Sequence, residues 1–196
     1  RDREKLSVAY TYMPRSDYFD SIKIDAYRQV SQRIFNSFPS LMIAPGLRSD
    51  TEIITDSELT SDGLNMQFNF APGDRQELVT GIQYVTDEVD QIRYRDNFIN
   101  GIPRSSEVVT DKASLSTLAF YAQDEIGLSE NISMLLGARY YQVDGELEES
   151  GRFESLPDFD DTELVKSIAF TYTPSETLTW RMSYSDGYIY PSLLNL

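Results

Sequence analysis

Three adjacent residues, Arg93, Tyr94 and Arg95, are the strongest candidates for ligand recognition in this sequence of 196 residues. A guanidinium group is planar and stays charged, so it pairs strongly with carboxylates and with similar oxygen anions. These residues would therefore suit the mouth of a site that takes an anionic ligand. The alternative is salt bridging to the acidic residues of the same segment, which are Asp87, Glu88, Asp90 and Asp96.

A second candidate is the acidic segment from Asp144 to Asp161, in which Arg152 is the one basic residue. Oxygen ligands of this kind bind hard cations such as calcium, and Asp158, Asp160 and Asp161 are the weak candidates for such a metal site. The charge could also repel unwanted ligands, and the plain alternative is a solvated loop. The other acidic residues of the segment are Glu146, Glu148, Glu149 and Glu154.

The residue types that are missing limit the chemistry further. The chain has no His and no Cys, so it cannot form a Ser-His or Cys-His pair or a zinc site of the usual ligand types. We find no Gly-rich phosphate loop, so the sequence predicts neither an enzyme nor a cofactor. The formal net charge of −15 excludes nucleic acid as a partner, because no basic stripe is present to neutralise phosphates.

The elements that must position these residues are predicted to be strands, because apolar and polar residues alternate with a period of two. Clear alternation covers Leu6 to Tyr12, Leu64 to Phe70, Ile132 to Tyr140 and Leu178 to Tyr184. Weaker alternation covers Ile22 to Tyr27, Leu78 to Val85, Leu118 to Ile126 and Leu164 to Tyr172. The sequence therefore predicts about eight antiparallel strands and an all-β fold.

The connections between these strands alternate between short and long. Short turns are predicted at Met13 to Asp17, Ala71 to Asp74, Ser129 to Asn131 and Pro174 to Thr177. Long links are predicted at Phe35 to Thr55, Val89 to Glu107 and Asp144 to Asp161. This asymmetry is typical of transmembrane β-barrels, whose turns are periplasmic and whose loops are extracellular. The alternative is a soluble β-sandwich that acts as a binding module.

If these strands cross a membrane, their two faces contact two different environments. The apolar face would contact lipid, and tyrosines near the strand ends would lie at the membrane interfaces. The polar face would line the interior of the barrel. The residues predicted to face the interior are Asn65, Gln67, Arg139, Thr179 and Arg181.

Two groups of motifs in the second half resemble a known family. The stretch Leu118-Ala-Phe-Tyr-Ala-Gln-Asp-Glu-Ile126, followed by Leu136-Gly-Ala-Arg-Tyr140, is similar to a strand pair of TonB-dependent receptors. The stretches Phe170-Thr-Tyr-Thr-Pro174 and Tyr184-Ser-Asp-Gly187, with Tyr190-Pro-Ser192, follow the same family's later pattern.

The resemblance implies an outer-membrane receptor that imports an iron complex, either a ferric siderophore or haem, with energy from TonB. It also implies a barrel of about 22 strands that is filled by a plug. Arg139 and Arg181 would contact the plug, and the alternative is that they pair with Glu125 or another acid of the wall. Leu6 to Tyr12 with Ile22 to Tyr27 is similar to the haem receptor branch. That branch has an Arg where this chain has Tyr188-Ile-Tyr-Pro191, and no His is present to ligate haem.

The predicted strand directions place both ends of the chain on the extracellular side. Complete bacterial barrels have both ends in the periplasm, so residues 1–196 are expected to be part of a larger barrel. The plug and the remaining strands would lie outside this sequence. The alternative is a small, self-contained barrel of eight strands with a structural or adhesive role.

Overall fold

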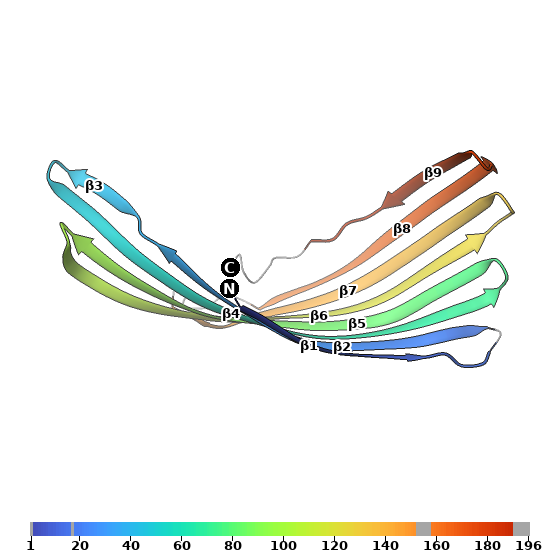
Figure 1. Cartoon of the computed structure of the whole chain (residues 1–196), viewed down its shortest axis with the longest axis horizontal. Helices are drawn as coiled ribbons and strands as arrows, with labels where there is room; N and C mark the ends of the chain where they lie inside the picture. Colours follow the sequence, from blue (N-terminus) through green and yellow to red (C-terminus); the bar gives the residue numbers. More distant parts are fainter. Residues whose placement is uncertain (1, 17, 152–157, 190–196) are drawn as a thin grey trace.

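The computed structural model describes residues 2–16, 18–151 and 158–189, and all of its regular elements are β-strands. No helix long and apolar enough to cross a membrane occurs in these ranges. The nine strands form one antiparallel sheet that is bowed along its length and open at both edges (Figure 1). The strands are β1 (Asp2–Tyr12), β2 (Phe19–Ser37), β3 (Ser40–Ala44), β4 (Leu47–Gly73), β5 (Gln76–Ile99), β6 (Ile102–Gly127), β7 (Ile132–Ser150), β8 (Phe159–Ser175) and β9 (Leu178–Ser185).

The sheet is a meander in which each strand pairs with its neighbours in the chain, in the order β1-β2-β4-β5-β6-β7-β8-β9. β3 pairs with β4 at Leu47 to Asp50, directly beyond the part of β4 that pairs with β2. The row is interrupted at Pro39, which has no N–H to donate, although its carbonyl oxygen still accepts a bond from the Thr51 N–H at 2.9 Å. β2 and β3 thus form one row, and the eight predicted strands are confirmed.

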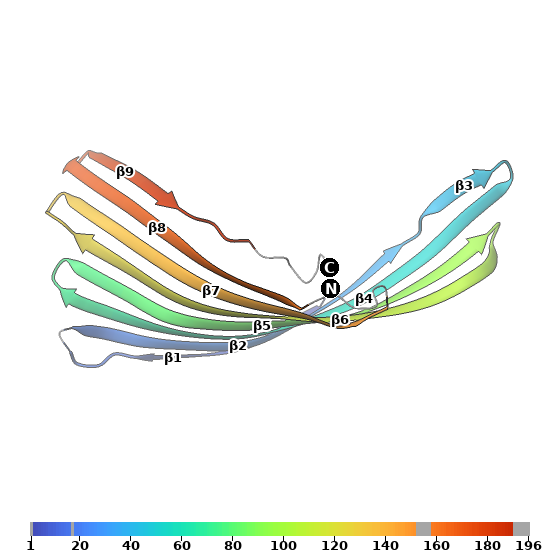
Figure 2. The ribbon, with the colours of Figure 1, turned by 180° about the vertical axis from the view of Figure 1, so that it is seen from behind.

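The strands are much longer than the sequence predicted, and this corrects the prediction of long loops. β4 has 27 residues, β5 has 24 and β6 has 26, whereas about 9–11 tilted residues cross the hydrocarbon layer. The links at Phe35 to Thr55 and Val89 to Glu107 are therefore mostly strand, because paired hairpins satisfy backbone groups that a loop would leave to water. Figure 2 shows the two resulting long hairpins at one end of the sheet and the short turns at the other.

The ends of the two long hairpins are joined by the Asn100 side chain in addition to backbone pairing, which includes the Asn100 N–H to Arg48 carbonyl bond at 2.9 Å. Asn100 and Gly101 have φ angles of 50° and 78°, the left-handed geometry of a tight hairpin turn that favours Asn-Gly. The Asn100 Oδ1 accepts a hydrogen bond from the Arg48 N–H at 2.8 Å, and its Nδ2 donates to the Gly46 carbonyl at 3.1 Å. The β5–β6 turn is thereby fixed against the β3–β4 turn.

The same end carries one charged pair with a shifted pKa. The Arg48 Nε donates to Asp50 Oδ1 at 2.7 Å and also lies 2.9 Å from Ser40 Oγ. Hydrogen bonds from Ser40 and then from Arg48 hold the pKa of Asp50 below its usual value. The pair is exposed, so it contributes little to stability at ordinary salt concentrations.

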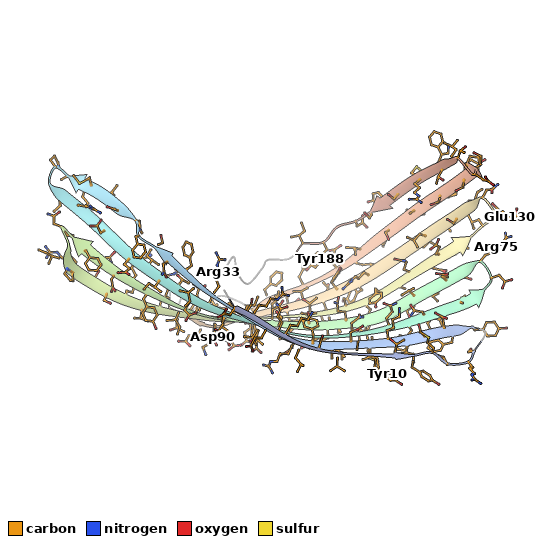
Figure 3. All side chains as sticks on the ribbon, in the orientation of Figure 1. Tyr10, Arg33, Arg75, Asp90, Glu130 and Tyr188 are labelled. Carbon is orange, nitrogen blue, oxygen red and sulfur yellow. The ribbon has the colours of Figure 1, made fainter. Side chains whose placement is uncertain are left out.

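The two faces of the sheet differ sharply in composition. Residues that are directly paired across strands point to the same side, and Tyr10, Ile24, Met66, Ile82 and Phe120 form one such row. This face is the convex one, and many of its large apolar side chains, such as Leu64, Tyr84 and Phe120, are exposed, as expected for a surface that meets lipid. In Figure 3, Tyr10 and Asp90 lie on this side of the ribbon, and Arg33 and Tyr188 lie on the other.

The other face is concave, and it holds all of the buried residues of the described ranges. Side chains converge on the inside of a curved sheet, so small residues such as Ala113 and Ala119 are shielded there without a second layer. Val89, Ala113, Leu115 and Val143 form an apolar cluster on this face. The predicted interior residues Asn65, Gln67, Arg139, Thr179 and Arg181 also lie on the concave face, by their register.

Replacing Asn100 should loosen the end of the long hairpins without unfolding the sheet. Asn100→Ala loses both side-chain bonds and places an alanine at positive φ, so we expect a local cost of about 1–2 kcal/mol. Asn100→Gly also loses both side-chain bonds, but glycine adopts a positive φ without strain, so its free-energy cost should be smaller. Amide hydrogen exchange at residues 44–50 would measure this, with Ser106→Ala as the control. Equal protection in all variants would contradict the role of Asn100.

Candidate functional site on the concave wall

Between the apolar cluster and the tips of the long hairpins, the concave wall has a recess of about 340 Å³ that contains two arginines and a phenylalanine. Arg33 and Phe35 come from β2 and Arg93 comes from β5, and the guanidinium carbon of Arg33 lies 5.9 Å from the Phe35 ring centroid. Guanidinium groups bind oxygen anions, and the ring offers a flat apolar contact. The full lining is Ser31, Arg33, Phe35, Thr55, Ser57, Leu59, Gln91 and Arg93.

Arg95 lies one row further from the apolar cluster, on the same face as Arg93. Its NH1 is 3.9 Å from the Glu107 carboxylate, to which it is paired in the register of β5 and β6. Its partner is thus an acid on the next strand and is not one of the four acids predicted to pair with these arginines, Asp87, Glu88, Asp90 and Asp96. Both side chains are about half exposed, so the pair is weak and does not prevent Arg95 from contacting a ligand.

Tyr94 does not belong to this recess. Successive side chains of a strand point to opposite faces, so Tyr94 lies on the convex face with Ile54 and Val108, its partners in the register. The three residues that the sequence grouped together are therefore split. Arg93 and Arg95 stay together, and Tyr94 is on the outer surface.

Nearer the short turns, Arg139 forms a second feature of the concave wall. Its guanidinium carbon lies 5.6 Å from the Tyr121 ring centroid and 4.8 Å from that of Tyr141, and its NH2 donates to Gln83 Oε1. Within the described ranges its Nε is buried without a hydrogen-bond partner. The two rings and Gln83 hold the charge in place, so Arg139 presents a fixed cation to the space that the wall encloses.

Arg181 lies on the same face as Arg139 but on β9, paired with Thr171. Neither arginine has a carboxylate within 4.0 Å among the ion pairs of the described residues. Contact of these two residues with a plug stays a prediction.

The acidic residues proposed for a cation site do not form one cluster. Asp160 and Asp161 are adjacent on β8 and so point to opposite faces, and Asp158 precedes the strand. Asp161 accepts hydrogen bonds from the Tyr188 hydroxyl at 2.8 Å and from the Thr162 N–H at 2.9 Å. Over the described ranges no group of three or more acids is arranged to hold a metal ion. Arg152 and Glu154 lie outside these ranges, so the cation site stays a prediction without support.

The sequence analysis did not single out Tyr188 as a contact residue. It follows β9, and its ring centroid lies 5.3 Å from that of Tyr141, where it packs against the apolar cluster. The only available signal was its place after Tyr184-Ser-Asp-Gly187, where a glycine lets the chain leave the strand. Tyr190-Pro-Ser192, the last part of that motif, lies outside the described residues.

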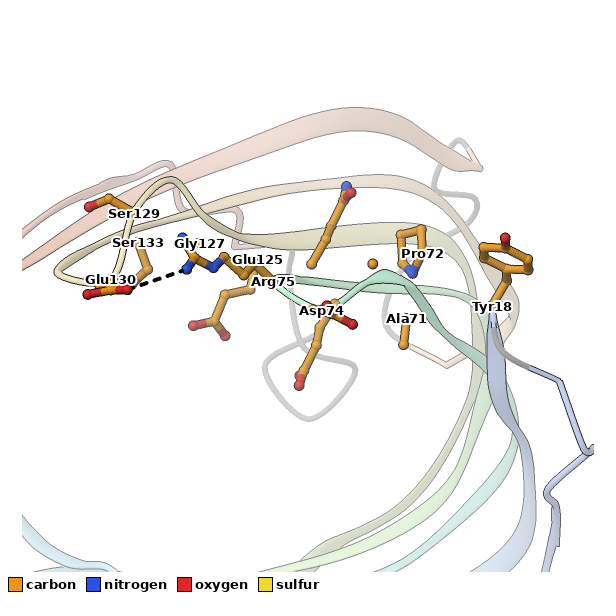
Figure 4. Close-up of a pocket in the computed structure, with 13 residues that line it drawn as sticks. Tyr18, Ala71, Pro72, Asp74, Arg75, Glu125, Gly127, Ser129, Glu130 and Ser133 are labelled. Carbon is orange, nitrogen blue, oxygen red and sulfur yellow. Dashed lines mark ion pairs between the residues drawn. The ribbon is translucent and has the colours of Figure 1, made fainter.

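The end of the sheet that carries the short turns has a separate, more open recess of about 880 Å³. It lies between the β4–β5 turn and the β6–β7 turn, which are bridged by Arg75 and Glu130 at 4.0 Å (Figure 4). Both side chains are largely exposed, so this ion pair contributes little to stability. We find no grouping of side chains there that would bind a particular ligand.

The complete chain, residues 1–196, matches the family described as TonB dependent receptor-like, beta-barrel. Among solved structures, the copper transporter OprC superposes with a TM-score of 0.79 at 12% identity, covering 99% of this chain and 31% of that chain. The ferric citrate transporter FecA in its unliganded form gives a TM-score of 0.67 at 12% identity, over 92% of this chain and 26% of that chain.

A third solved structure is BauA, the ferric preacinetobactin receptor from Acinetobacter baumannii, with a TM-score of 0.61 at 15% identity. The alignment covers 89% of this chain and 28% of BauA. The chain thus spans less than a third of the length of these three proteins, and at these identities the likeness shows the fold alone. No curated protein sequence matches the chain.

Close packing on the concave wall predicts different outcomes for two glycines. A Cβ at Gly81 would meet the Tyr121 ring and also the Met66 carbonyl oxygen at 2.5 Å, which is backbone and cannot move away. The three atoms nearest to a Cβ at Gly63 all belong to the Tyr27 side chain, which can shift more easily than backbone. We expect Gly81→Ala to cost about 1–3 kcal/mol and Gly63→Ala clearly less. Urea unfolding of the receptor in detergent would measure both, and equal losses would contradict this packing.

Proposed function

The chain belongs to the TonB-dependent receptor β-barrel family, and we propose that it forms part of the barrel wall of a receptor that imports an iron complex. Barrels of this family lie in the outer membrane of Gram-negative bacteria. The candidate ligands are a ferric siderophore and haem. Residues 1–196 would supply one sector of the wall, and the plug domain and the other strands would come from outside this sequence.

The observation that carries this proposal is the recess with Arg33, Phe35 and Arg93 on the concave face. It lies on the parts of β2, β4 and β5 that extend beyond the apolar band of the convex face, so it would open into the extracellular mouth of the barrel. Carboxylate, catecholate and propionate oxygens are all anionic, and each suits a pair of guanidinium groups. Arg95 lies close enough in the same wall to extend the positive surface.

The remaining partners follow from the family. A plug inside the barrel would respond to the bound ligand and would be moved by TonB from the periplasmic side. Arg139 is the best candidate in this wall for contact with the plug, because its charge is fixed by Tyr121, Tyr141 and Gln83 and its Nε has no partner among the described residues. A plug carboxylate or carbonyl would bind the terminal nitrogens of the guanidinium group, because the Nε is buried in the wall.

The choice between a siderophore and haem rests on weak signals. The first strands are similar to the haem branch, but the Arg of that branch's motif is replaced in Tyr188-Ile-Tyr-Pro191, and any His ligand must come from another part of the receptor. Uptake assays with both ligand classes would decide the matter.

Removing the positive charges of the recess should weaken ligand binding. We expect Arg93→Ala to raise the Kd of the transported iron complex about tenfold or more, since a charge-assisted hydrogen bond contributes about 1.5–3 kcal/mol. Equilibrium binding to the purified receptor and uptake of the radioactive iron complex by whole cells would measure the change. Arg95→Ala should have a smaller effect, because Glu107 already shares its charge.

The adjacent residue gives a matched control. Tyr94→Ala changes the convex face and should leave both the Kd and uptake unchanged. If Tyr94→Ala impaired uptake as much as Arg93→Ala, or if neither changed it, the recess would not be the ligand site.

A further inference from the structure

The convex face has a second apolar surface, well separated from the band that meets lipid. It is formed by Ile34, Ile54, Ile92, Tyr94 and Val108, which we call the outer patch. Ile34 is 65% exposed, Val108 60% and Tyr94 45%. These residues come from β2, β4, β5 and β6, which pair side by side, although β2 beyond Gln32 and β6 before Asp111 have no further partner strand among the described residues. A strand added at either edge would pair in the plane of the sheet, so it would not cover the convex face of the patch.

The rest of a barrel would not cover the patch either. A plug lies inside a barrel, on the concave side, and the outer patch faces the opposite way, as Asp90 does in Figure 3. Rigid apolar side chains in water are unfavourable unless something binds to them, and exposed apolar patches with polar rims commonly mark interaction sites.

The outer patch lies too far from the lipid-facing band for the acyl chains of the membrane to cover it. On β4 the last large apolar residue of that band is Leu64, and Asp62, Thr60, Glu58 and Asp56 follow on the same face before Ile54. Ile34 and Ile92, at the near edge of the patch, pair with Asp56, which is eight residues from Leu64. At about 3.3 Å per residue and a tilt of roughly 45°, this edge lies about 19 Å above Leu64 and Ile54 about 23 Å. The interval is acidic, and it would also repel the phosphates of an anionic lipid surface.

A groove of about 500 Å³ runs along the edge of the outer patch that is nearer to the lipid-facing band. Ile34 and Ile92 provide its apolar part, and Asp56, Glu58 and Asp90 provide carboxylates. Lys112 is the basic residue in the groove, and it already pairs with Asp90 at 3.3 Å. The full lining is Asp2, Gln32, Ile34, Asp56, Glu58, Asp90, Ile92, Thr110 and Lys112.

Charge then decides between a second copy of this chain and a different protein. Two copies that met through this face would bring their carboxylates together, and Glu52 and Asp96 add to the acidic rim. A chain that carries basic residues next to aliphatic ones fits better. The stem of a lysine or an arginine would lie over Ile34 and Ile92, and its charged end would reach Asp56 or Glu58.

We propose that the outer patch and its groove are an extracellular docking site for a protein segment that alternates basic and aliphatic side chains. This surface is distinct from the concave recess, and it accounts for Tyr94, which the recess does not use. The site does not depend on which ligand the receptor imports.

The test uses the full receptor purified from outer membranes and, as the probe, a short synthetic peptide of alternating lysine and leucine. Binding is measured by fluorescence anisotropy, with a peptide of alternating glutamate and leucine as the second probe. The expected result is saturable binding of the lysine peptide alone. Ile92→Ser and the pair Asp56→Asn with Glu58→Gln should each weaken it about tenfold.

A charge control makes the test specific. The pair Asp144→Asn with Glu146→Gln removes two exposed carboxylates from the same face on β7, outside the groove, and should leave the affinity within about twofold. An equal loss in this control, no effect of Ile92→Ser, or equal binding of the glutamate peptide would each overturn the proposal. Analytical ultracentrifugation showing a dimer that Val108→Ser abolishes would overturn it in favour of a second copy.

Discussion

The continuous ladder of backbone hydrogen bonds is the constraint on which the rest of this structure depends. A strand that crosses a membrane must satisfy every N–H and C=O through its neighbours. In the meander, β4 and β5 pair with each other from the short turns to the tips of the hairpins, and the outer sides of β1 and β9 are open edges. Because the ladder fixes the register, it also fixes the face on which each side chain lies. A slip of one residue would exchange the surface that meets lipid for the interior.

The curvature of the sheet makes side-chain packing different on its two faces. Side chains converge on the concave face, so alanines and glycines occur there beside large rings, and a charged group such as Arg139 is held by the aromatic residues next to it. On the convex face the side chains diverge, and large apolar residues stay exposed because lipid replaces a second layer of protein. A single sheet therefore provides a packed interior wall without a hydrophobic core of the soluble kind.

The length of the strands explains where the concave recess and the outer patch lie. The hairpins of β2 to β6 continue beyond the apolar band as paired strands, so the recess with Arg33 and Arg93 lies on a rigid wall rather than on a loose loop. The same rigidity applies to the outer patch on the opposite side. One strand, β5, thus contributes Arg93 to the concave surface and Tyr94 to the convex one, so the two proposed sites face opposite ways.

The sequence by itself determined the strand class, the number of strand rows, the short turns and the face of residues such as Asn65 and Arg139, because a period of two is a local property. It also carries the Asn100-Gly101 pair, which is typical of a tight hairpin turn, although the surrounding residues predicted a long loop. Only the tertiary structure decided how far the strands extend, which cross-strand partner Arg95 finds, and that Tyr188 packs on Tyr141. Those outcomes depend on register and curvature, which bring together residues that are far apart in the chain.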